Sequence, residues 1–453
     1  MAMEIPSILE KIVRDIESIG GRSYLVGGAV IDIIQERKLK EWDIEVYKLS
    51  IHQLEDLLKN YGSPNLVGKS FGIIKLRADG NDYDFNIPRK ESRIGINHKN
   101  FKVEFPDMTP EEAAYRRDLT INSMFFDLIN KILLDPYHGL EDLKQGILRH
   151  TSDKFTEDPL RVLRIMQLLP RKGRRVADET IELCKKMIDE HNYLPKERIF
   201  EEWNKLLMKA NNPSLGLQFL EDCSWIKHYP ELDALRFVEQ NPDWHPEGNV
   251  FDHTKLVLDN AAILRNMLPE EWQLSFMYGL LLHDVGKAVT TSEELTSYGH
   301  NKAGVPLAEG FMKRITNDIK LSQRVFDIVR YHMHPGLLYN SNAKESAWKR
   351  LHNKIPLNII GYVSKADAAG RQKRSLKDSY PPSNKTFELF EIYGQDKIPM
   401  LLMGRDLLKL GYEPGRIIGE ILKQAYELQI EEDIQDKETL IKELKSNGII
   451  KNE

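Results

Sequence analysis

Two acidic residues, Asp43 and Glu45, alternate with apolar residues over positions 42–46. An alternation with a period of two predicts a half-buried strand, on which residues i and i+2 share a face. Both carboxylates therefore point the same way, and they repel each other unless a cation lies between them. Mg²⁺ prefers oxygen ligands of this kind. The pair predicts a magnesium site, although a surface strand with two solvated acids would produce the same pattern.

A glycine turn and a second acidic strand accompany this pair. An apolar run ends in Gly27 and Gly28, where a backbone without side chains can approach phosphate groups closely. The segments 73–76 and 83–87 have the composition of two strands joined by a tight turn. Asp84, on the second of these strands, could stand beside the first acidic pair.

A second group of residues with metal-binding chemistry lies in the other half of the chain. His253 opens a predicted helix, His283 and Asp284 follow an apolar run, and Asp367 comes later. Neutral imidazoles and carboxylates that helices bring to one point form a cage for a divalent metal. A lone histidine is more often structural, but this ordered set is hard to explain by packing. Weaker candidates are His300, His332 and His334.

Arginines occur at two places that suit a phosphate ligand. Arg116 and Arg117 are adjacent, and guanidinium groups match the geometry of phosphate oxygens, although an exposed helix start would also explain them. Arg161 and Arg164 are one helical turn apart and follow the acidic segment 157–158. Helix capping and dipole complementarity account for this second segment fully.

The elements that must position these residues change along the chain. The sequence up to about residue 136 mixes strands and helices, and from about residue 139 the pattern is helical. A stretch rich in proline and glycine at 240–249 indicates a boundary in front of the histidines. The segment 91–114 has weak periodicity and mixed charge, which predicts a long, mobile loop.

Size and composition limit the class of protein. With 453 residues, 41% of them hydrophobic, the chain exceeds one ordinary core and is expected to form several domains. The formal net charge of -5 means that any nucleic acid must bind to local patches. The only cysteines, Cys184 and Cys223, form no disulfide framework, which favours a reducing compartment. Without a membrane-length apolar run or a signal-peptide pattern, we expect a cytoplasmic protein that does not bind membranes.

The ordered motifs resemble the class II CCA-adding enzymes, which are tRNA nucleotidyltransferases of the polymerase β superfamily. In the first half, the resemblance rests on the segments 26–30 (VGGAV), 43–45 (DIE), 116–122 (RRDLTIN), 135–139 (DPYHG) and 157–164 (EDPLRVLR). In the second half, the segment 244–248 (WHPEG) with His253, His283, Asp284 and Asp367 resembles the variant that carries an HD phosphohydrolase domain.

This resemblance implies an α+β fold followed by all-α domains. The expected regions are a nucleotidyltransferase head at 1–138, a nucleotide-selecting helical neck at 139–239, an HD domain at 240–375 and a helical tail at 376–453. Asp43 and Glu45 would bind Mg²⁺, with Asp84 as the third acid. The metals would activate the tRNA 3′-hydroxyl for in-line attack on the α-phosphate.

By the same resemblance, protein side chains replace a nucleic-acid template. Asp158 can accept a hydrogen bond from an exocyclic amine while Arg161 donates to a neighbouring ring acceptor. Such a pair admits CTP and ATP and rejects UTP and GTP. The nucleotide-binding residues that the motifs imply are Gly27, Gly28, Arg116, Arg117, Asp118, Asn122, Glu157, Asp158, Arg161 and Arg164.

The sequence departs from the family at two positions, and the resemblance also implies a second activity. Ile31 stands where the family has arginine, and Glu45 stands where it has aspartate, so a cation is lost and a carboxylate arm is lengthened. In the HD domain, His253, His283, Asp284 and Asp367 would hold a divalent transition metal that activates water to hydrolyse phosphate esters.

We therefore expect an enzyme that adds CCA, or its terminal A, to tRNA from CTP and ATP. The 91–114 segment has the family's usual length, whereas CC-only relatives have a shorter one. Three alternatives are a poly(A) polymerase of the same superfamily, an HD hydrolase with an inactive RNA-binding head, and a non-catalytic RNA-binding protein. The sequence does not indicate the oligomeric state.

Overall fold

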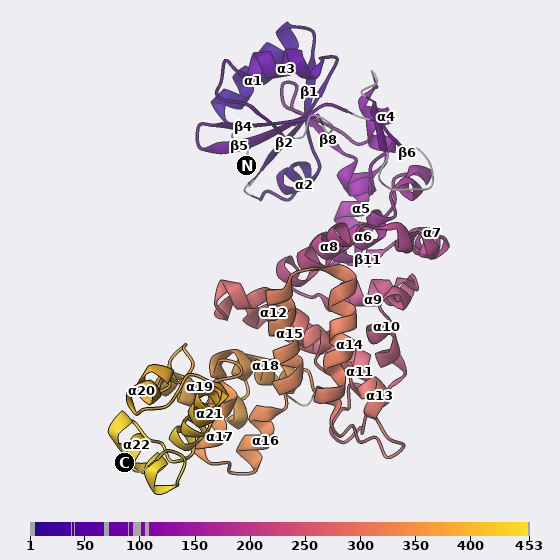
Figure 1. The fold of residues 1–453 in the computed structure, drawn as a ribbon. Helices are drawn as coiled ribbons and strands as arrows, with labels where there is room; N and C mark the ends of the chain where they lie inside the picture. The colour runs from indigo at the N-terminus through magenta and orange to yellow at the C-terminus, as the bar shows by residue number, and fades with distance from the viewer. Residues whose placement is uncertain are drawn as a thin grey trace. The chain divides into compact units, whose positions relative to one another are not determined.

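The chain divides into two compact units in the computed structural model. The first comprises Met1–Ala210 and Leu215–His228, and the second comprises Asn211–Ser214 and Tyr229–Glu453. Figure 1 shows the first unit in indigo to magenta and the second in rose to yellow. The structure describes residues 5–37, 39, 41–67, 72–88, 90–93, 101–104, 108–372 and 374–451.

The first unit begins with a mixed sheet whose strands follow the order β3-β4-β5-β2-β1-β8-β9. Strands β2 and β5 are its one parallel pair among the described residues, and the other neighbours are antiparallel. The predicted strands at 42–46, 73–76 and 83–87 are confirmed. The bounds are β1 Arg22–Val26, β2 Trp42–Tyr47, β3 Asn65–Val67, β4 Ile73–Ala78, β5 Asn81–Asn86, β8 Phe125–Asp127 and β9 Ile132–Leu134.

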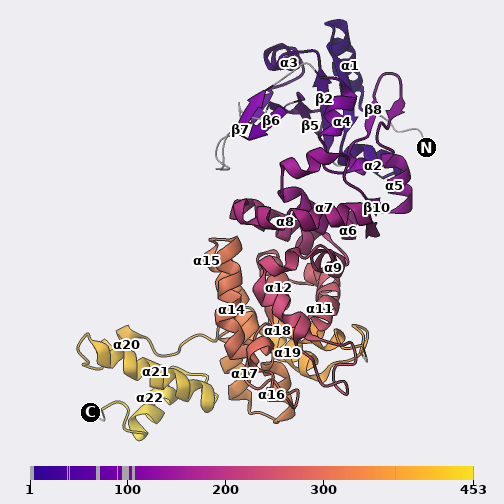
Figure 2. The same ribbon diagram turned by 90° about the vertical axis from the view of Figure 1, so that its right-hand side faces the viewer.

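Short helices cover and connect this sheet. Helix α1 (Ser7–Ser18) buries the apolar side chains of one face, including Leu9 and Ile16, and ends before a glycine pair. Helix α3 (Ile51–Leu58) starts with a capping box and lies beside α1 in both views (Figures 1 and 2). Helix α2 (Gly28–Ile34) follows the glycine turn after β1.

The predicted loop at 91–114 was wrong for much of its length. Strands β6 (Lys90–Arg93) and β7 (Phe101–Glu104) pair as an antiparallel ribbon, and α4 (Pro110–Tyr115) begins with a capping box. Residues 94–100 and 105–107 of the predicted loop lie outside the described residues. The hydrogen bonds of this ribbon are between backbone groups, which every sequence has. The side-chain pattern, whose periodicity is weak, therefore did not predict the ribbon. The Thr109 capping box with proline at the first turn was a helix signal that the prediction overlooked.

Helices dominate the rest of the first unit. Helix α6 packs along α8, and both bury one apolar face that includes Leu163 and Trp203. Strand β10 (Ile147–Leu148) precedes α6 in the chain, and β11 (Arg175–Val176) follows α6. The two strands pair in parallel. The helices are α5 Gly139–Gln145, α6 Leu160–Lys172, α7 Asp178–Lys186, α8 Lys196–Lys209 and α9 Ser214–Asp222.

The second unit contains helices and loops, with no strand among its described residues. Helix α12 is buried along its C-terminal half and contacts α11, α15 and α18, so it forms the centre of this unit. The bounds are α10 Pro230–Asp233, α11 Val250–Leu264, α12 Glu270–Leu282, α13 Lys287–Thr290, α14 His300–Ile315, α15 Ile319–Tyr331, α16 His334–Asn340, α17 Glu345–His352 and α18 Leu357–Ala369.

The C-terminal helices add a small core of their own. Leu407, Ile421 and Leu440 belong to a buried cluster formed within the segment 402–450. The predicted helical periodicity at 404–427 is confirmed, with its breaks between α20 and α21. The bounds are α19 Pro381–Tyr393, α20 Gly404–Lys409, α21 Arg416–Glu431 and α22 Lys437–Ser446. In the part of the chain described here, no helix is both long and apolar enough to cross a bilayer.

Candidate active sites

Strands β2 and β5 bring two acids of the first unit side by side. The strands run parallel, and their register pairs Asp43 with Asp84. Asp43 and Glu45 lie two positions apart on β2 and so share a face, as their spacing predicted. Burial and the neighbouring Asp84 carboxylate raise the pKa of Asp43 to about 6. A carboxyl group in such surroundings favours a proton or a cation beside it.

The remaining acid of the predicted set, Glu45, is already paired. Its Oε2 lies 2.5 Å from Nη2 of Arg117, and the Tyr47 hydroxyl donates to its Oε1. Among the described residues, the three predicted acids do not form a group whose ligand atoms all lie within 4.8 Å of one another. The structure thus brings Asp43 and Asp84 together, whereas Glu45 engages Arg117.

Two residues of this site, Lys75 and Tyr47, were missed by the sequence analysis. Nζ of Lys75 lies 2.9 Å from Oδ2 of Asp84, its partner across strands β4 and β5. The period-two pattern of β4 places Lys75 on a solvent-facing position, so the cross-strand pair was a signal that could have been used. Both Asp84 and Glu45 therefore have a cationic side chain beside them.

The glycine turn lies at the start of α2. Gly27 has a φ of 64°, a left-handed conformation that residues with a side chain rarely adopt. A Cβ atom added to Gly27 or Gly28 would meet no atom within 4 Å, so the backbone there is open to a ligand. Ile31 is 1% exposed and belongs to the core, so this position presents no charge to the acids.

The segment after α4 forms ion pairs with α6 and the turn before it. Arg116 Nη2 lies 2.6 Å from Oε2 of Glu157. Asp118 accepts hydrogen bonds from Arg164 Nε at 2.7 Å and from Asn122 Nδ2 at 3.0 Å. Burial alone would raise the pKa of Asp118, but the Arg164 charge and the Asn122 hydrogen bond outweigh it and lower the pKa to about 2. The five predicted residues therefore form two groups, Arg116 with Glu157 and Asp118 with Asn122 and Arg164.

The residues expected to select the nucleotide have intramolecular partners. Arg161 donates from Nη1 to the carbonyl of Lys154 and from Nη2 to the carbonyl of Arg116, both at 2.6 Å. Asp158 accepts from the first turn of α6 through Oδ1 and lies 2.8 Å from Arg198 Nη2 through Oδ2. Arg198, on α8, had no sequence signal, because nothing in its local pattern links it to Asp158.

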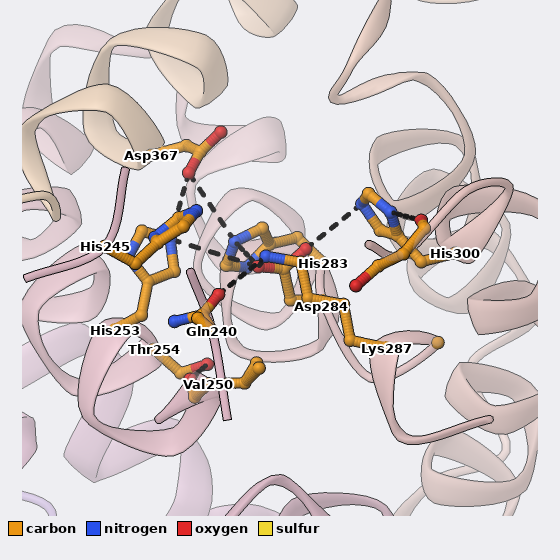
Figure 3. Close-up of polar contacts among 12 residues, drawn as sticks. Gln240, His245, Val250, His253, Thr254, His283, Asp284, Lys287, His300 and Asp367 are labelled. Atoms are coloured by element: carbon orange, nitrogen blue, oxygen red, sulfur yellow. Dashed lines mark hydrogen bonds and ion pairs between the residues drawn. The ribbon is translucent and has the colours of Figure 1, made fainter. Parts of the chain in front are cut away.

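In the second unit, three helical segments direct metal-ligand side chains to one point (Figure 3). His253 comes from α11, His283 and Asp284 follow α12, and Asp367 comes from α18. His253 Nε2 lies 3.0 Å from Oδ1 of Asp367, and His283 Nε2 lies 3.3 Å from Oδ2 of Asp284. The four residues predicted from the sequence are therefore brought together.

Two of the three weaker candidates join this site through Asp284. Its Oδ1 lies 3.2 Å from His300 Nε2 and 3.7 Å from His332 Nε2, and these two nitrogens are 3.1 Å apart. Asp284 thus offers one oxygen to each of two ligand groups, one with His283 and one with His300 and His332. His334 belongs to neither group among the described residues, and its ring packs against Tyr331.

Hydrogen bonds fix the direction of all four imidazoles. A backbone carbonyl only accepts, so a histidine whose Nδ1 meets one carries its proton on Nδ1 and presents the Nε2 lone pair. The Nδ1 contacts are His253 to Glu247 at 2.8 Å, His283 to Leu280 at 2.7 Å, His300 to Ser297 at 2.7 Å and His332 to Val329 at 2.8 Å. This arrangement is the usual support of metal-bound histidines.

The charges of the site also fit a metal. Nε2 of His283 is buried and has no hydrogen-bond partner in the described part of the chain, so its lone pair is unused. Burial lowers the pKa of His332 to about 3, which keeps this imidazole neutral. Burial opposes the ionisation of Asp367, but the His253 hydrogen bond and the Arg371 charge outweigh it and hold its pKa well below the usual range. Burial opposes the protonation of His253 and His300, but the hydrogen bonds of Asp367 and Asp284 outweigh it and raise the pKa of both imidazoles. A divalent metal would take the place of those protons, because it binds neutral imidazoles and ionised carboxylates.

The sequence analysis gave no role to four further residues around this centre. Lys287 Nζ lies 2.7 Å from Oδ2 of Asp284 and donates to Oε1 of Gln240 at 2.9 Å (Figure 3). Nδ1 of His245 lies 2.8 Å from Oε1 of Glu247. His245 and Glu247 fell within a recognised motif, and Lys287 follows the His-Asp pair by one turn, whereas Gln240 had no signal.

Family models match most of the chain. The models described as "Poly A polymerase head domain", "Probable RNA and SrmB- binding site of polymerase A" and "HD domain" match residues 23–149, 175–235 and 250–369, respectively. The first contains Asp43 and Asp84, and the third contains His253 and Asp367.

Individual relatives match nearly the whole length. A "Multifunctional CCA protein" of Psychromonas ingrahamii is 31% identical over 414 residues, which cover 88% of this chain and 95% of the relative. A CCA-adding enzyme solved with CTP covers 98% of this chain and 96% of its own, with a TM-score of 0.66 and 19% identity. The Thermotoga maritima CCA-adding enzyme with tRNA covers 98% and 96%, with a TM-score of 0.60 and 17% identity.

Proposed function

Since the chain belongs to the class II CCA-adding enzymes, in the group that carries an HD domain, we propose that it adds CCA, or its terminal A, to tRNA 3′ ends from CTP and ATP. The observation that carries this proposal is the 31% identity to a multifunctional CCA protein over 95% of that relative's length. The CTP and tRNA complexes of solved enzymes with this fold support the choice of substrates.

We propose a head at 1–138, a neck at 139–239, an HD domain at 240–375 and a tail at 376–453. The matched families at 23–149, 175–235 and 250–369 support these regions. In the head, Asp43, Asp84 and Glu45 would hold Mg²⁺. The bound ion would supply Lewis-acid activation of the 3′-hydroxyl and charge stabilisation at the α-phosphate.

The head residues have distinct tasks in this proposal. Asp43 has a partly buried carboxylate beside that of Asp84, and its raised pKa supports a site for a cation there. Glu45 would be a ligand of the cation in place of its contact with Arg117, and the guanidinium would then be available to the triphosphate.

For nucleotide selection we propose Asp158 and Arg161, with Arg198 as a positioning residue for Asp158. Arg198 orients Oδ2 of Asp158, and Arg161 is held by two carbonyls, so both groups are fixed before a base arrives. A preorganised donor and acceptor discriminate bases better than mobile ones. The proposed selection is for an amine beside a ring acceptor, as in cytosine and adenine.

Incorporation of labelled nucleotides tests the head. tRNA that lacks its terminal nucleotides is incubated with Mg²⁺ and each nucleotide separately, and then with CTP and ATP together. The proposal predicts incorporation of C and A only, ending after a fixed number of additions. Long homopolymeric tails would favour a poly(A) polymerase instead.

We further propose that the second unit hydrolyses phosphate esters. The observation that carries this proposal is that the Nε2 atoms of four histidines lie within 4.0 Å of a carboxylate oxygen of Asp284 or Asp367. His253, His283, Asp284 and Asp367 would hold one divalent ion, and Asp284 with His300 and His332 would hold a second. Such ions would supply an activated water and polarise a phosphate oxygen.

The chain's own residues prepare this centre. Glu247 and three backbone carbonyls hold the imidazoles in the ligand tautomer, and Lys287 neutralises part of the Asp284 charge. Assays with 2′,3′-cyclic nucleotides, 2′-nucleotides and simple phosphomonoesters, each with several divalent metals, test the activity. Absence of hydrolysis with every metal would overturn it.

One alternative has an observation in its favour. Glu45 is occupied by Arg117 and Tyr47, and Ile31 is buried where the family has arginine. A head that no longer transfers nucleotides but still binds RNA would have these features. The incorporation assay separates the two accounts, because such a protein would bind tRNA and hydrolyse phosphate esters without extending the tRNA.

A further inference from the structure

Arg371 lies at the edge of the helical metal centre. Helix α18 carries Asp367 and ends at Ala369, and Arg371 follows four residues after Asp367, about one helical turn along. Gly370 lies between them, and a Cβ atom there would meet His253 Cε1 at 3.2 Å, so this turn packs closely on the centre. The inference below rests on the phosphohydrolase proposed for this unit.

The Arg371 guanidinium has an unused donor. Its Nε is buried and has no hydrogen-bond partner among the described residues. A buried guanidinium donor without an acceptor is unfavourable, and a ligand oxygen is the natural partner for it. Because Gly370, the preceding residue, packs against His253, the chain places Arg371 beside the centre.

The other cation of the centre is not free in this way. Lys287 Nζ lies 2.7 Å from Asp284 and 2.9 Å from the Gln240 side-chain oxygen, so its hydrogen bonds are used within the protein. Lys287 therefore balances the charge of a ligand carboxylate. Arg371 is left as the positive group that can face a substrate.

The charge of the centre indicates what that substrate carries. Asp284, Asp367 and Glu247 are three carboxylates, and Lys287 and Arg371 supply only two positive charges. Divalent metals reverse this balance and make the centre positive. A phosphate group with two negative charges would then be attracted to the metals on one side and to a guanidinium fork on the other.

We propose that Arg371 is the phosphate-binding side chain of this centre. Its fork binds two phosphate oxygens of the ester, while the metal ligands remain on the opposite side of the phosphorus. The substrate class is an ester with an accessible phosphate, terminal or cyclic, rather than an internal linkage enclosed within a nucleic-acid strand. A planar, always-charged guanidinium suits this role better than an ammonium group.

Binding of inorganic phosphate to the Mn²⁺-loaded full-length protein tests the proposal without relying on turnover. Isothermal titration measures Kd for Mn²⁺ and then for phosphate in wild type, Arg371→Gln and Arg371→Lys. Arg374→Gln is the matched control, because Arg374 lies three residues away with its guanidinium over the Tyr380 ring. The Michaelis constant for a phosphomonoester is measured in parallel.

We expect Arg371→Gln to weaken phosphate binding by about 10- to 100-fold, as for a lost charge-assisted pair, with Mn²⁺ affinity within about twofold. Arg371→Lys restores part of the affinity, and Arg374→Gln changes it by less than about threefold. Equal effects of the two Gln variants, or equal loss of Mn²⁺ and phosphate affinity, would overturn the proposal. If Arg371→Gln loses phosphate binding but the wild-type protein hydrolyses no ester, the phosphate subsite would be upheld and the proposed hydrolase activity refuted.

Discussion

The two candidate sites surround their acids with different side chains. In the head, Glu45 and Asp84 each lie against a cationic side chain, Arg117 or Lys75, and Asp43 lies beside the Asp84 carboxylate. In the helical centre, Asp284 also has a cation, Lys287, but the two ligand carboxylates lie mainly against the Nε2 atoms of histidines. The head therefore offers carboxylates alone to a metal, whereas the helical centre offers carboxylates together with imidazoles.

This difference indicates how each site would acquire its metal. The ion pair of Asp84 with Lys75 is partly exposed and exchanges partners at little cost, so the head can take up Mg²⁺ together with a nucleotide. Imidazoles held by Glu247 and by backbone carbonyls are fixed before any ion arrives, which favours a resident transition metal. We expect a transient metal in the first unit and a bound one in the second.

The largest expected effect concerns Asp284, which faces both ligand groups. Asp284→Asn should lower hydrolysis by on the order of 10³-fold and reduce the metal content measured by elemental analysis. His334→Ala is the control, because His334 lies outside both groups. Nucleotide addition should stay within about twofold in both variants. A variant Asp284→Asn with its full metal content would break the comparison.

A smaller effect should follow from the support of His253. Glu247→Gln removes the carboxylate that holds Nδ1 of His253, and we expect metal affinity to fall by about 10- to 100-fold. Competition with a metal indicator dye measures this loss. Unchanged affinity would show that the imidazole needs no carboxylate to keep its tautomer.

In the first unit, removing one member of an ion pair should affect folding rather than metal binding. Arg164→Gln leaves the buried Asp118 carboxylate without its main partner, and we expect a loss of roughly 2–4 kcal/mol in unfolding free energy. Urea denaturation with hydrogen exchange in α6 measures and locates the loss. A fall in bound transition metal without a fall in stability would contradict this account.

The smallest effect is a pH dependence of the same pair. The pKa of Asp118 is about 2 in the folded chain and 3.8 in the reference state, so the unfolded chain binds its proton first. The stability that this carboxylate contributes is complete above about pH 5 and disappears between about pH 5 and pH 1, roughly 2 kcal/mol in total. Wild type should lose more stability over this range than Asp118→Asn. Parallel pH profiles would contradict the assignment.

In the head, the sequence could predict which face the acids share but not which residue pairs with them. Strand periodicity placed Asp43 and Glu45 on one face, because a period of two leaves no choice of side. The partnership of Glu45 with Arg117 could not be predicted, because it spans 72 residues and depends on how the segment after α4 returns to β2.

Helical ligands were predicted by residue type and order. That approach proposed His253, His283, Asp284 and Asp367, which the structure brings together, but could not rank His300 and His332 above His334. The distinction depends on the direction of each Nε2, which backbone carbonyls fix only after the helices have packed. The β6–β7 ribbon was missed for a related reason, since its pairing depends on backbone groups that carry no sequence signature.

The central claim is that two independent sites in one chain perform two metal-dependent reactions. Asp43→Asn and His283→Ala, assayed side by side for labelled CMP and AMP incorporation into tRNA and for phosphate-ester hydrolysis, test it most directly. We predict that Asp43→Asn loses incorporation and keeps hydrolysis, and that His283→Ala does the reverse. Loss of both activities in either variant, or incorporation that survives Asp43→Asn, would contradict the account.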